Sequence, residues 1–434
     1  MKSAHAFILI ASLSAGFVLA EDKTAPTIKP DMVVAGDGSG DFKTIQEAIN
    51  AVPRDNHQRQ IIFIKDGLYH EKVRIDPGFI TLRGQSRQGA RIEFPQGNDA
   101  FTNRPDNIGR AVVNINGSDV VMENLTVKNT DGVIGPHAFA VYGQADRTVI
   151  VDCNVWSDGA DTLALGKGLS TRSYQARLDI RGSVDFVCPR GWCYMTDCAF
   201  HQVNPKADAT IWHDGGKDMD MKFVLRNCRF EGVGDMPSWI LARHHHDAQF
   251  FLLDCNFSKT LSNRPPLRVI YPLNHGTPSE ADSKRNHDLD ASNVWGERAY
   301  FYNCHRDGGD YAWHRDNLSS ATYSPAPGQI TAAWTFAGKW DPERRAGPKI
   351  EKIAQRDGQC EVIFSESVTV KGKPRLVLKS GGFAVYSAGS GSDTLIFARH
   401  DSSPSEVSKV DLQDGCILAS EAAASLRLAD LSTP

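Results

Sequence analysis

Five segments of the chain repeat one pattern: a run of apolar residues, then Asp or Asn, then Cys. The repeats end at Cys153, Cys198, Cys228, Cys255 and Cys304, and an earlier segment, VVMENLTV, fits with Leu125 in the cysteine position. A β-rich unit that repeats every 20–30 residues or so is typical of stacked coils, each of which buries its apolar face against the next. We therefore predict a parallel β-helix with these cysteines stacked inside as reduced thiols, in preference to disulfides. The wider gaps between repeats leave room for an extra strand or a long loop.

The segments on either side of the repeats predict a cap and a second module. GDFKTIQEAINAVP predicts a helix over the open end of the coils, with a Thr44–Glu47 capping box, an end at Pro53 and one apolar face, formed by Phe42, Ile45, Ile49 and Val52. After about residue 347, short alternating runs broken by Gly and Ser predict a small immunoglobulin-like β-sandwich over 355–430. The β-helix domain is expected over 31–346. Whether Cys360 and Cys416 form a disulfide is left undecided by the sequence.

The N-terminus has the features of an export signal. Lys2 precedes an apolar run over residues 6–20 that ends in a small-residue cleavage site, so we predict a signal peptide over residues 1–20. The run is about 15 residues long, short of the ~20 that span a bilayer. We expect a secreted or periplasmic protein with no membrane attachment after cleavage.

Composition narrows the class of partner. The chain of 434 residues is 41% hydrophobic and 23% charged with a formal net charge of −4, which is typical of a soluble globular protein. No basic stripe is present, so nucleic-acid binding is not expected. The segment 259–294 is polar and contains prolines, and predicts a long excursion from the coils over a functional face.

One acidic residue stands in unusual surroundings. In GSVDFVCPRGWC, Asp185 lies between Val184 and Phe186 in what the pattern predicts to be a strand, close to further apolar residues. Ionisation is costly there, so Asp185 is either paired with a cation or takes part in chemistry. Cys188 and Cys193 follow it closely; a structural role, such as a local disulfide, is favoured over a nucleophilic thiol.

Three motifs in order resemble those of the pectinesterase family: GADTLAL with Asp161, GSVDFVCP with Asp185 and SWILARHHHDAQF with Arg243. The resemblance runs from about residue 31 to 345 and implies a right-handed, pectin-lyase-like parallel β-helix. It implies that Asp185 is the nucleophile, that Asp161 is the general acid and then the base, and that Arg243 keeps Asp185 ionised. The implied activity is removal of methyl esters from pectin or a related uronate polysaccharide, without a metal or organic cofactor, by a protein expected to be a monomer.

Three positions depart from the family pattern. His137 and Ala160 stand where the family has glutamines that help to stabilise the oxyanion, and His245 stands in place of an aromatic residue. We hypothesise that His137 donates an N–H to the oxyanion; the alternative is a histidine hydrogen-bonded to a neighbouring coil. By strand alternation His245 shares a face with Arg243, which makes it a candidate to stack on the sugar or to form a polar contact with it, while His244 and His246 point the other way. Three consecutive strand residues cannot converge on one ion, so no metal site is predicted there.

These departures leave other functions open. A thioesterase-like relative of the family would keep both aspartates and act on a different ester. A non-catalytic β-helix that binds wall polysaccharide would have lost its oxyanion-stabilising groups, although retention of Asp161, Asp185 and Arg243 together argues against it. A pectate lyase would need a calcium-binding cluster of carboxylates, which the sequence does not supply.

Overall fold

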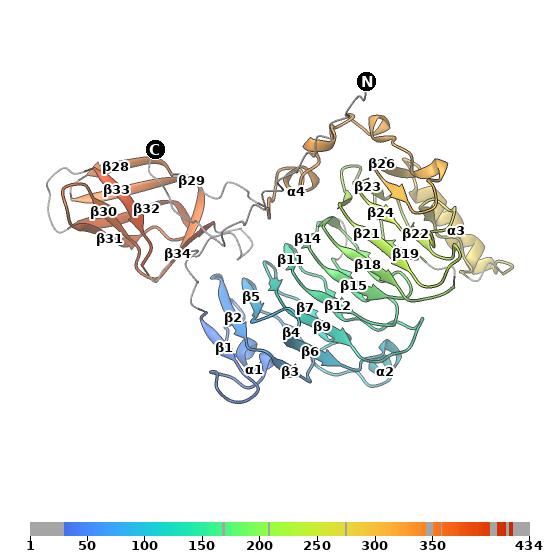
Figure 1. The fold of residues 1–434 in the computed structure, drawn as a ribbon, viewed down its shortest axis with the longest axis horizontal. Coiled ribbons are helices and arrows are strands. Elements are labelled where there is room, and N and C mark those ends of the chain that lie inside the picture. Colours follow the sequence, from blue (N-terminus) through green and yellow to red (C-terminus); the bar gives the residue numbers. More distant parts are fainter. Residues whose placement is uncertain are drawn as a thin grey trace, which may run out of the picture.

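The computed structural model describes residues 30–166, 170–206, 209–273, 276–343, 350–356, 358–399, 406–413 and 416–419. The predicted signal peptide over residues 1–20 lies outside these ranges. Within them, the first 27 strands, β1 to β27, form three parallel sheets that wind into a β-helix, and the remaining strands form a separate antiparallel sheet (Figure 1). The predicted fold class is thereby confirmed.

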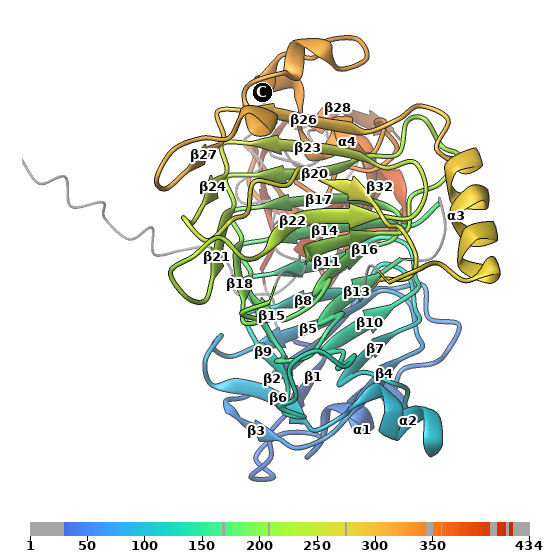
Figure 2. The ribbon, with the colours of Figure 1, turned by 90° about the vertical axis from the view of Figure 1, so that its right-hand side faces the viewer.

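Each full coil of the β-helix contributes one strand to each of three sheets, here called A, B and C (Figure 2). Sheet A contains, in spatial order, β1 (Met32–Val34), β2 (Gln60–Ile64), β5 (Ile80–Gly84), β8 (Val121–Glu123), β11 (Thr148–Val151), β14 (Arg172–Ala176), β17 (Trp192–Thr196), β20 (Phe223–Arg226), β23 (Gln249–Leu253) and β26 (Arg298–Tyr302). Sheet B contains β3 (Gly67–Tyr69), β6 (Ala90–Phe94), β9 (Thr126–Asn129), β12 (Asn154–Trp156), β15 (Asp179–Gly182), β18 (Ala199–Gln202), β21 (Arg229–Gly232), β24 (Asn256–Phe257) and β27 (His305–Arg306). Sheet C contains β4 (Val73–Ile75), β7 (Val113–Ile115), β10 (Val141–Gly143), β13 (Leu163–Leu165), β16 (Val187–Pro189), β19 (Ala209–His213), β22 (Ile240–His244) and β25 (Leu267–Arg268).

The Asp or Asn of the repeat has a backbone role at the turn from sheet A to sheet B. All six such residues have a positive φ between 50° and 56°: Asn124, Asp152, Asp197, Asn227, Asp254 and Asn303. Asn and Asp tolerate this left-handed conformation better than other residues with a side chain. The wide gap between Cys153 and Cys198 holds one more coil, whose turn uses Arg177 with φ 54°. An extra strand in that gap was one of the two outcomes that the spacing predicted.

The cysteine after each turn lies in the interior of the coils. Cys153, Cys198, Cys228, Cys255 and Cys304 are all buried and carry free thiols. The Cys255 thiol hydrogen-bonds to those of Cys228 and Cys304 in the coils on either side. The predicted stack of reduced thiols is therefore confirmed, and it continues a core in which Phe200 stacks on Phe230 with ring centroids 4.4 Å apart.

Helices cover one end and parts of the surface of the β-helix. Helix α1 (Ile45–Asn50) closes the N-terminal end with the predicted Thr44–Glu47 capping box, and buries Ile45, Ala48 and Ile49. The other helical segments are α2 (Asn98–Asn103), α3 (Glu280–Ser292), η1 (Ala312–His314), η2 (Leu318–Ser320), η3 (Pro327–Gln329) and α4 (Ala332–Thr335). The predicted excursion over 259–294 contains β25 and α3.

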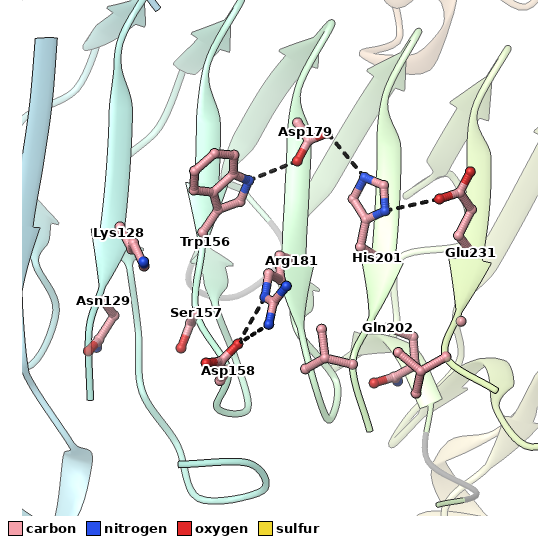
Figure 3. A pocket seen from close by; sticks show the side chains of 13 residues that line it. Lys128, Asn129, Trp156, Ser157, Asp158, Asp179, Arg181, His201, Gln202 and Glu231 are labelled. Carbon is pink, nitrogen blue, oxygen red and sulfur yellow. Dashed lines mark hydrogen bonds and ion pairs between the residues drawn. The ribbon is translucent and has the colours of Figure 1, made fainter. Parts of the chain in front are cut away.

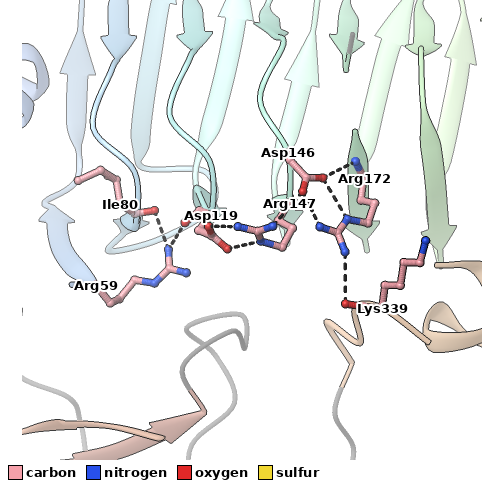
Figure 4. A network of polar contacts seen from close by, with 7 residues as sticks. All are labelled: Arg59, Ile80, Asp119, Asp146, Arg147, Arg172 and Lys339. Carbon is pink, nitrogen blue, oxygen red and sulfur yellow. Dashed lines mark hydrogen bonds and ion pairs between the residues drawn. The ribbon is translucent and has the colours of Figure 1, made fainter. Parts of the chain in front are cut away.

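The outer face of sheet A is apolar and is covered by the chain that follows β26. Leu318, Ile330, Phe336 and Trp340 pack there against side chains of sheet A. A polar network at the turns into sheet A strengthens this attachment (Figure 4). Arg147 binds both oxygens of Asp119, at 2.7 and 2.6 Å, and Arg172 binds Asp146 and donates to the backbone oxygen of Lys339 at 3.2 Å.

The C-terminal module is an antiparallel sheet with its own buried core. Its strands are β28 (Ile350–Arg356), β29 (Gln359–Lys371), β30 (Arg375–Leu378), β31 (Phe383–Ala388), β32 (Ser392–Arg399), β33 (Val407–Asp411) and β34 (Cys416–Ala419). The first part of β29 pairs with β32 and its last part pairs with β34.

This pairing excludes a disulfide between Cys360 and Cys416. Cys360 lies near the start of β29, whereas Cys416 pairs with Lys371 at its end. Eleven residues of strand at about 3.3 Å each separate the two positions, far more than the ~7 Å that a disulfide tolerates between Cα atoms. Cys360 carries a free thiol. No helix within the described ranges has the length and hydrophobicity needed to cross a membrane.

Candidate active site

Asp161 and Asp185 occupy equivalent positions in two adjacent coils of sheet C. Strand β13 pairs with β16 so that Leu163 lies opposite Val187, and each aspartate stands two residues before this pair. The register places their backbones about 4.8 Å apart, one coil spacing. The Asp161 N–H donates to the oxygen of Val184, next to Asp185, at 3.1 Å. The two carboxylates therefore belong to one site.

The local conformation at Asp185 differs from the strand predicted for it. Strand β16 begins only at Val187, and Asp185 has a φ of 46°, in the left-handed region. Phe186 is fully buried in the core, but Val184 is only half-buried. The prediction of a strand at Asp185 is thus wrong, because the chain turns here from sheet B into sheet C.

Arg243 on β22 forms a two-pronged ion pair with Asp185. Its Nε donates to both carboxylate oxygens, at 2.9 and 3.0 Å, and its Nη2 donates to Oδ2 at 2.5 Å. The side chains are only 17% and 9% exposed, so water screens this pair little. The guanidinium also lies over the Trp212 ring, 5.6 Å from its centroid. A carboxylate held in this way is stabilised in its charged form.

Asp161 has a different environment. Burial raises its pKa above the usual value, and the charges of His137 and Arg190 only partly oppose that effect. The Arg190 Nη2 lies 3.5 Å from Oδ2, and the His137 Nε2 lies 3.7 Å from Oδ1. The Cys188 thiol, which lies 2.7 Å from the backbone oxygen of Asp185, is also close enough to this carboxyl to lower its pKa. The two neighbouring aspartates thus differ in what stabilises them: a close cation for Asp185, and burial that favours the protonated form for Asp161.

The two histidines predicted to contact substrate lie on either side of this pair. His137 is 56% exposed, pairs with Ala160 through an isolated β-bridge, and stacks on Phe139 at 6.0 Å between ring centroids. His245 packs edge-on against Trp212 with ring centroids 4.3 Å apart, and its Nε2 lies 2.5 Å from the Tyr271 hydroxyl. Burial lowers the pKa of His245 to about 4, so its ring is neutral at ordinary pH.

The other two histidines of the HHH run have separate roles. His244 is buried, as strand alternation predicts, and binds the carboxylate of Glu297 at 2.6 Å. His246 does not point away from His245: β22 ends at His244, and the two rings lie 6.0 Å apart. Its Nδ1 lies 2.7 Å from the Ser292 hydroxyl. Within the described ranges, no group of three His, Cys, Asp or Glu side chains forms a candidate metal site.

Cys188 and Cys193 are not joined. Both are buried and carry free thiols, so the local disulfide considered from the sequence is wrong. Cys193 points into the core of the coils, whereas Cys188 packs beside Phe139 and Ala164 in a separate cluster. Burial and the charge of Asp161 raise the pKa of Cys188 well above its usual value. A protonated thiol is a poor nucleophile, which agrees with a structural role.

The pectinesterase family model matches residues 31–246, a range that contains Asp161, Asp185 and Arg243. Residues 31–246 therefore belong to the pectinesterase family. Among curated relatives, the pectinesterase of Petunia integrifolia is 34% identical over 210 residues, which cover 47% of this chain and 54% of that protein. Pectinesterase 2 of Citrus sinensis is 28% identical over 213 residues, or 48% of this chain and 40% of that protein. The matches thus span about half or less of these relatives.

Solved pectin methylesterases share the fold of this pectinesterase-family domain. The carrot enzyme aligns with a TM-score of 0.56 at 20% identity, over 73% of this chain and 96% of its own. The Erwinia chrysanthemi enzyme aligns with a TM-score of 0.57 at 20% identity, over 73% and 99%. A third pectin methylesterase with this fold was solved in complex with a hexasaccharide.

Three residues of this candidate site were not found from the sequence. Arg190 contacts Asp161 and lies 3.7 Å from Asp214, yet in the PRGW segment it resembles any surface arginine. Trp212 contacts both Arg243 and His245, and only the alternation of TIWHD could have suggested an outward ring. Tyr271 belongs to the excursion over 259–294. Its contact with His245 supports the prediction that this excursion lies over a functional face.

Proposed function

We propose that this chain is a carboxylic ester hydrolase that removes methyl esters from a pectin-type polygalacturonate, with Asp185 as the nucleophile. The observation that carries the proposal is the difference between adjacent aspartates. Asp185 is ion-paired with Arg243, while burial raises the pKa of the neighbouring Asp161. Ester cleavage with a carboxylate nucleophile needs one charged carboxylate and one neutral carboxylic acid within reach of the same ester.

In the first half of the reaction, a carboxylate oxygen of Asp185 attacks the carbonyl carbon of the methyl ester. The carbonyl electrons move to oxygen and form a tetrahedral oxyanion. When it collapses, the bond to the methoxy oxygen breaks, and that oxygen takes the proton of Asp161 and departs as methanol. The result is a mixed anhydride between the galacturonate and Asp185, with Asp161 as a carboxylate.

In the second half, the carboxylate of Asp161 takes a proton from a water molecule. The resulting hydroxide attacks the galacturonate acyl carbon, and the bond to Asp185 breaks. Asp185 regains its charge beside Arg243, and the galacturonate leaves as a free acid. Asp161 is protonated again, so both residues have returned to their starting states.

The oxyanion needs a hydrogen-bond donor, because the two glutamines of the family pattern are replaced here by His137 and Ala160. Ala160 is 3% exposed and has no side-chain donor. His137 is the candidate, because its Nε2 lies on the same side as the Asp161 carboxyl, 3.7 Å from Oδ1. An N–H at that position is within reach of an ester bound against both aspartates.

The test is methanol release from highly methylated pectin, measured for the wild-type protein and for Asp185→Asn. Both aspartates have left-handed backbones, φ 55° at Asp161 and 46° at Asp185, and asparagine tolerates that conformation, so the variant should fold. The expected result is turnover by the wild type and its loss in the variant. Equal activity in both proteins would reject Asp185 as nucleophile. Thiol release from an acyl-thioester, assayed in parallel, identifies the thioesterase-like alternative.

Export and domain organisation complete the proposal. A signal peptide over residues 1–20 would deliver the β-helix domain, 31–346, and the C-terminal module, 355–430, to the periplasm or the exterior. N-terminal sequencing of the protein recovered from the culture medium or periplasm tests it. A mature protein that begins after Ala20 is expected, and a retained Met1 would contradict the prediction.

A further inference from the structure

A second concave site lies on sheet B, on a different face of the coils from Asp161 and Asp185. It is a pocket of about 610 Å³ across the ends of β9, β12, β15, β18 and β21 (Figure 3). Ligand pockets of small molecules commonly measure about 300–1,000 Å³. The family resemblance assigned no role to any residue that lines it.

The pocket is lined by one column of side chains on successive strands. Trp156, Arg181, His201 and Glu231 lie opposite one another in the register of β12, β15, β18 and β21. The column spans about 14 Å, three strand spacings of about 4.8 Å. Figure 3, which views the pocket from close by, shows the flat face of the Trp156 indole.

Hydrogen bonds hold these groups in place. The Trp156 Nε1–H donates to Asp179 Oδ1 at 2.8 Å, and Asp179 Oδ2 lies 3.0 Å from His201 Nε2. The other ring nitrogen of His201 lies 3.2 Å from Glu231 Oε2. The aromatic face and the polar groups beside it are therefore fixed before any ligand arrives, which lowers the entropic cost of binding.

A buried amide that lines the same pocket has one donor without a hydrogen-bond partner among the described residues. Gln202, the last residue of β18, is 1% exposed, and its Oε1 accepts from the backbone N–H of Asn204 at 3.0 Å. Its Nε2 has no partner among the described residues. This nitrogen is itself closed off from solvent, so a ligand oxygen accepts from it only after the Gln202 side chain rotates toward the pocket. That rotation would relieve the cost of an unsatisfied buried donor, about 1–3 kcal/mol.

We propose that this pocket binds a neutral, hydroxyl-rich glycan chain that runs along the column from Trp156 to Glu231. A sugar ring stacks its C–H face on the indole, and hydroxyl groups can both donate to the carboxylates and accept from Arg181 and Gln202. The carboxylates of Asp158, Asp179 and Glu231 are each paired with Arg181 or His201. The pocket thus has no excess of positive charge that would select an acidic polymer.

The test is calorimetric titration of the full protein with cellohexaose, xylohexaose and a galacturonate hexamer. We expect at least one of the two neutral hexasaccharides to bind with a Kd in the millimolar range or tighter. Trp156→Ala should weaken that binding at least about tenfold. Val233→Trp should weaken it as much, because Val233 lines the pocket and is 41% exposed, so a larger side chain there fills the pocket without disturbing the core.

The matched control is Leu68→Trp, which adds the same ring on β3 of the same sheet, where Leu68 is 58% exposed and does not line the pocket. This control should bind like the wild type. If Trp156→Ala does not fold, Val233→Trp decides the outcome alone. Absence of binding by both neutral hexasaccharides would overturn the proposal. Binding of a neutral hexasaccharide that Val233→Trp leaves unchanged would also overturn it. So would a result in which only the galacturonate hexamer binds and Val233→Trp abolishes that binding.

Discussion

The β-helix presents carboxylates next to cations on two of its faces, in two different arrangements. On sheet C, Asp185 and Arg243 are 9% and 17% exposed, and Asp161 beside them has a pKa raised by burial. On sheet B, Asp179 is 36% exposed. Burial pushes its pKa up, but hydrogen bonds from His201 and Trp156 outweigh that effect and hold the pKa below its usual value.

This difference separates a site suited to catalysis from one suited to binding. A proton donor must be neutral at working pH, and burial without a close, well-aligned cation favours that state in an aspartate. Asp179 remains charged, and both of its carboxylate oxygens are hydrogen-bonded, to Trp156 and to His201. It can therefore orient a ligand but not protonate one. The same coil spacing produces both arrangements, and the balance between burial and nearby cations or hydrogen-bond donors decides which chemistry each supports.

The largest expected effect comes from a comparison of two arginine substitutions, one on each face. Arg243→Met should lower the free energy of unfolding by about 3 kcal/mol, because it removes the cation that pairs with a buried carboxylate. It should also lower turnover on the order of 10³-fold. Arg181→Met should cost less than ~1 kcal/mol, since its pair with Asp158 is 50% and 33% exposed. Urea unfolding and methanol release measure both effects. Equal destabilisation by the two variants would break the distinction between the faces.

A smaller effect is expected at His137, the proposed oxyanion donor. His137→Ala should lower kcat by roughly 10- to 100-fold with little change in KM, because the donor acts on charge that develops in the transition state. His137→Gln should recover part of the loss, since it restores a side-chain N–H. Steady-state kinetics on methylated pectin separate the two constants. An unchanged kcat in His137→Ala would assign this histidine to a structural role.

The pH profile gives a finer test of Asp161. Under the proposed mechanism, the alkaline limb of kcat/KM falls as Asp161 loses the proton that it would give to methanol. The Arg190 charge lowers the pKa of Asp161, so Arg190→Gln should raise that pKa and move the limb to higher pH. Arg190→Lys keeps the charge and should leave the limb near its wild-type position. A limb that moves to lower pH in Arg190→Gln would exclude Asp161 as the titrating acid.

The smallest expected effect is on stability at the sheet B pocket. A hydrogen bond to Asp179 raises the pKa of His201. The stabilisation from protonated His201 is therefore complete below the unfolded pKa of about 6.5 and is lost as pH rises through the higher folded pKa. His201→Gln should cost about 0.5–1 kcal/mol at pH 5 and less at pH 9. Urea midpoints at the two pH values measure it, and an equal cost at both would show that the charge of His201 plays no part.

Much of the scaffold was predictable because its determinants are local and repeated. Each Asn or Asp at a turn supplies a left-handed residue, and each following cysteine is small enough to stack inside, so the pattern in the sequence corresponds to one coil. The coil that turns at Arg177 shows the limit, because the tertiary fold places an arginine there without the motif. The capping box at Thr44 and Glu47 was likewise predictable from spacing alone.

The sequence by itself determined the stacked coils, the capping helix and the candidate pair of aspartates, because periodic burial and turn conformation depend on near neighbours along the chain. Only the tertiary structure decided that Arg243, 58 residues from Asp185, donates to both carboxylate oxygens of that aspartate. It also decided that Arg190 and His137 lie beside Asp161. Those contacts depend on how many coils separate the segments and on the strand register. Burial, which sets the pKa of Asp161 above its usual value, likewise arises only once the coils have stacked.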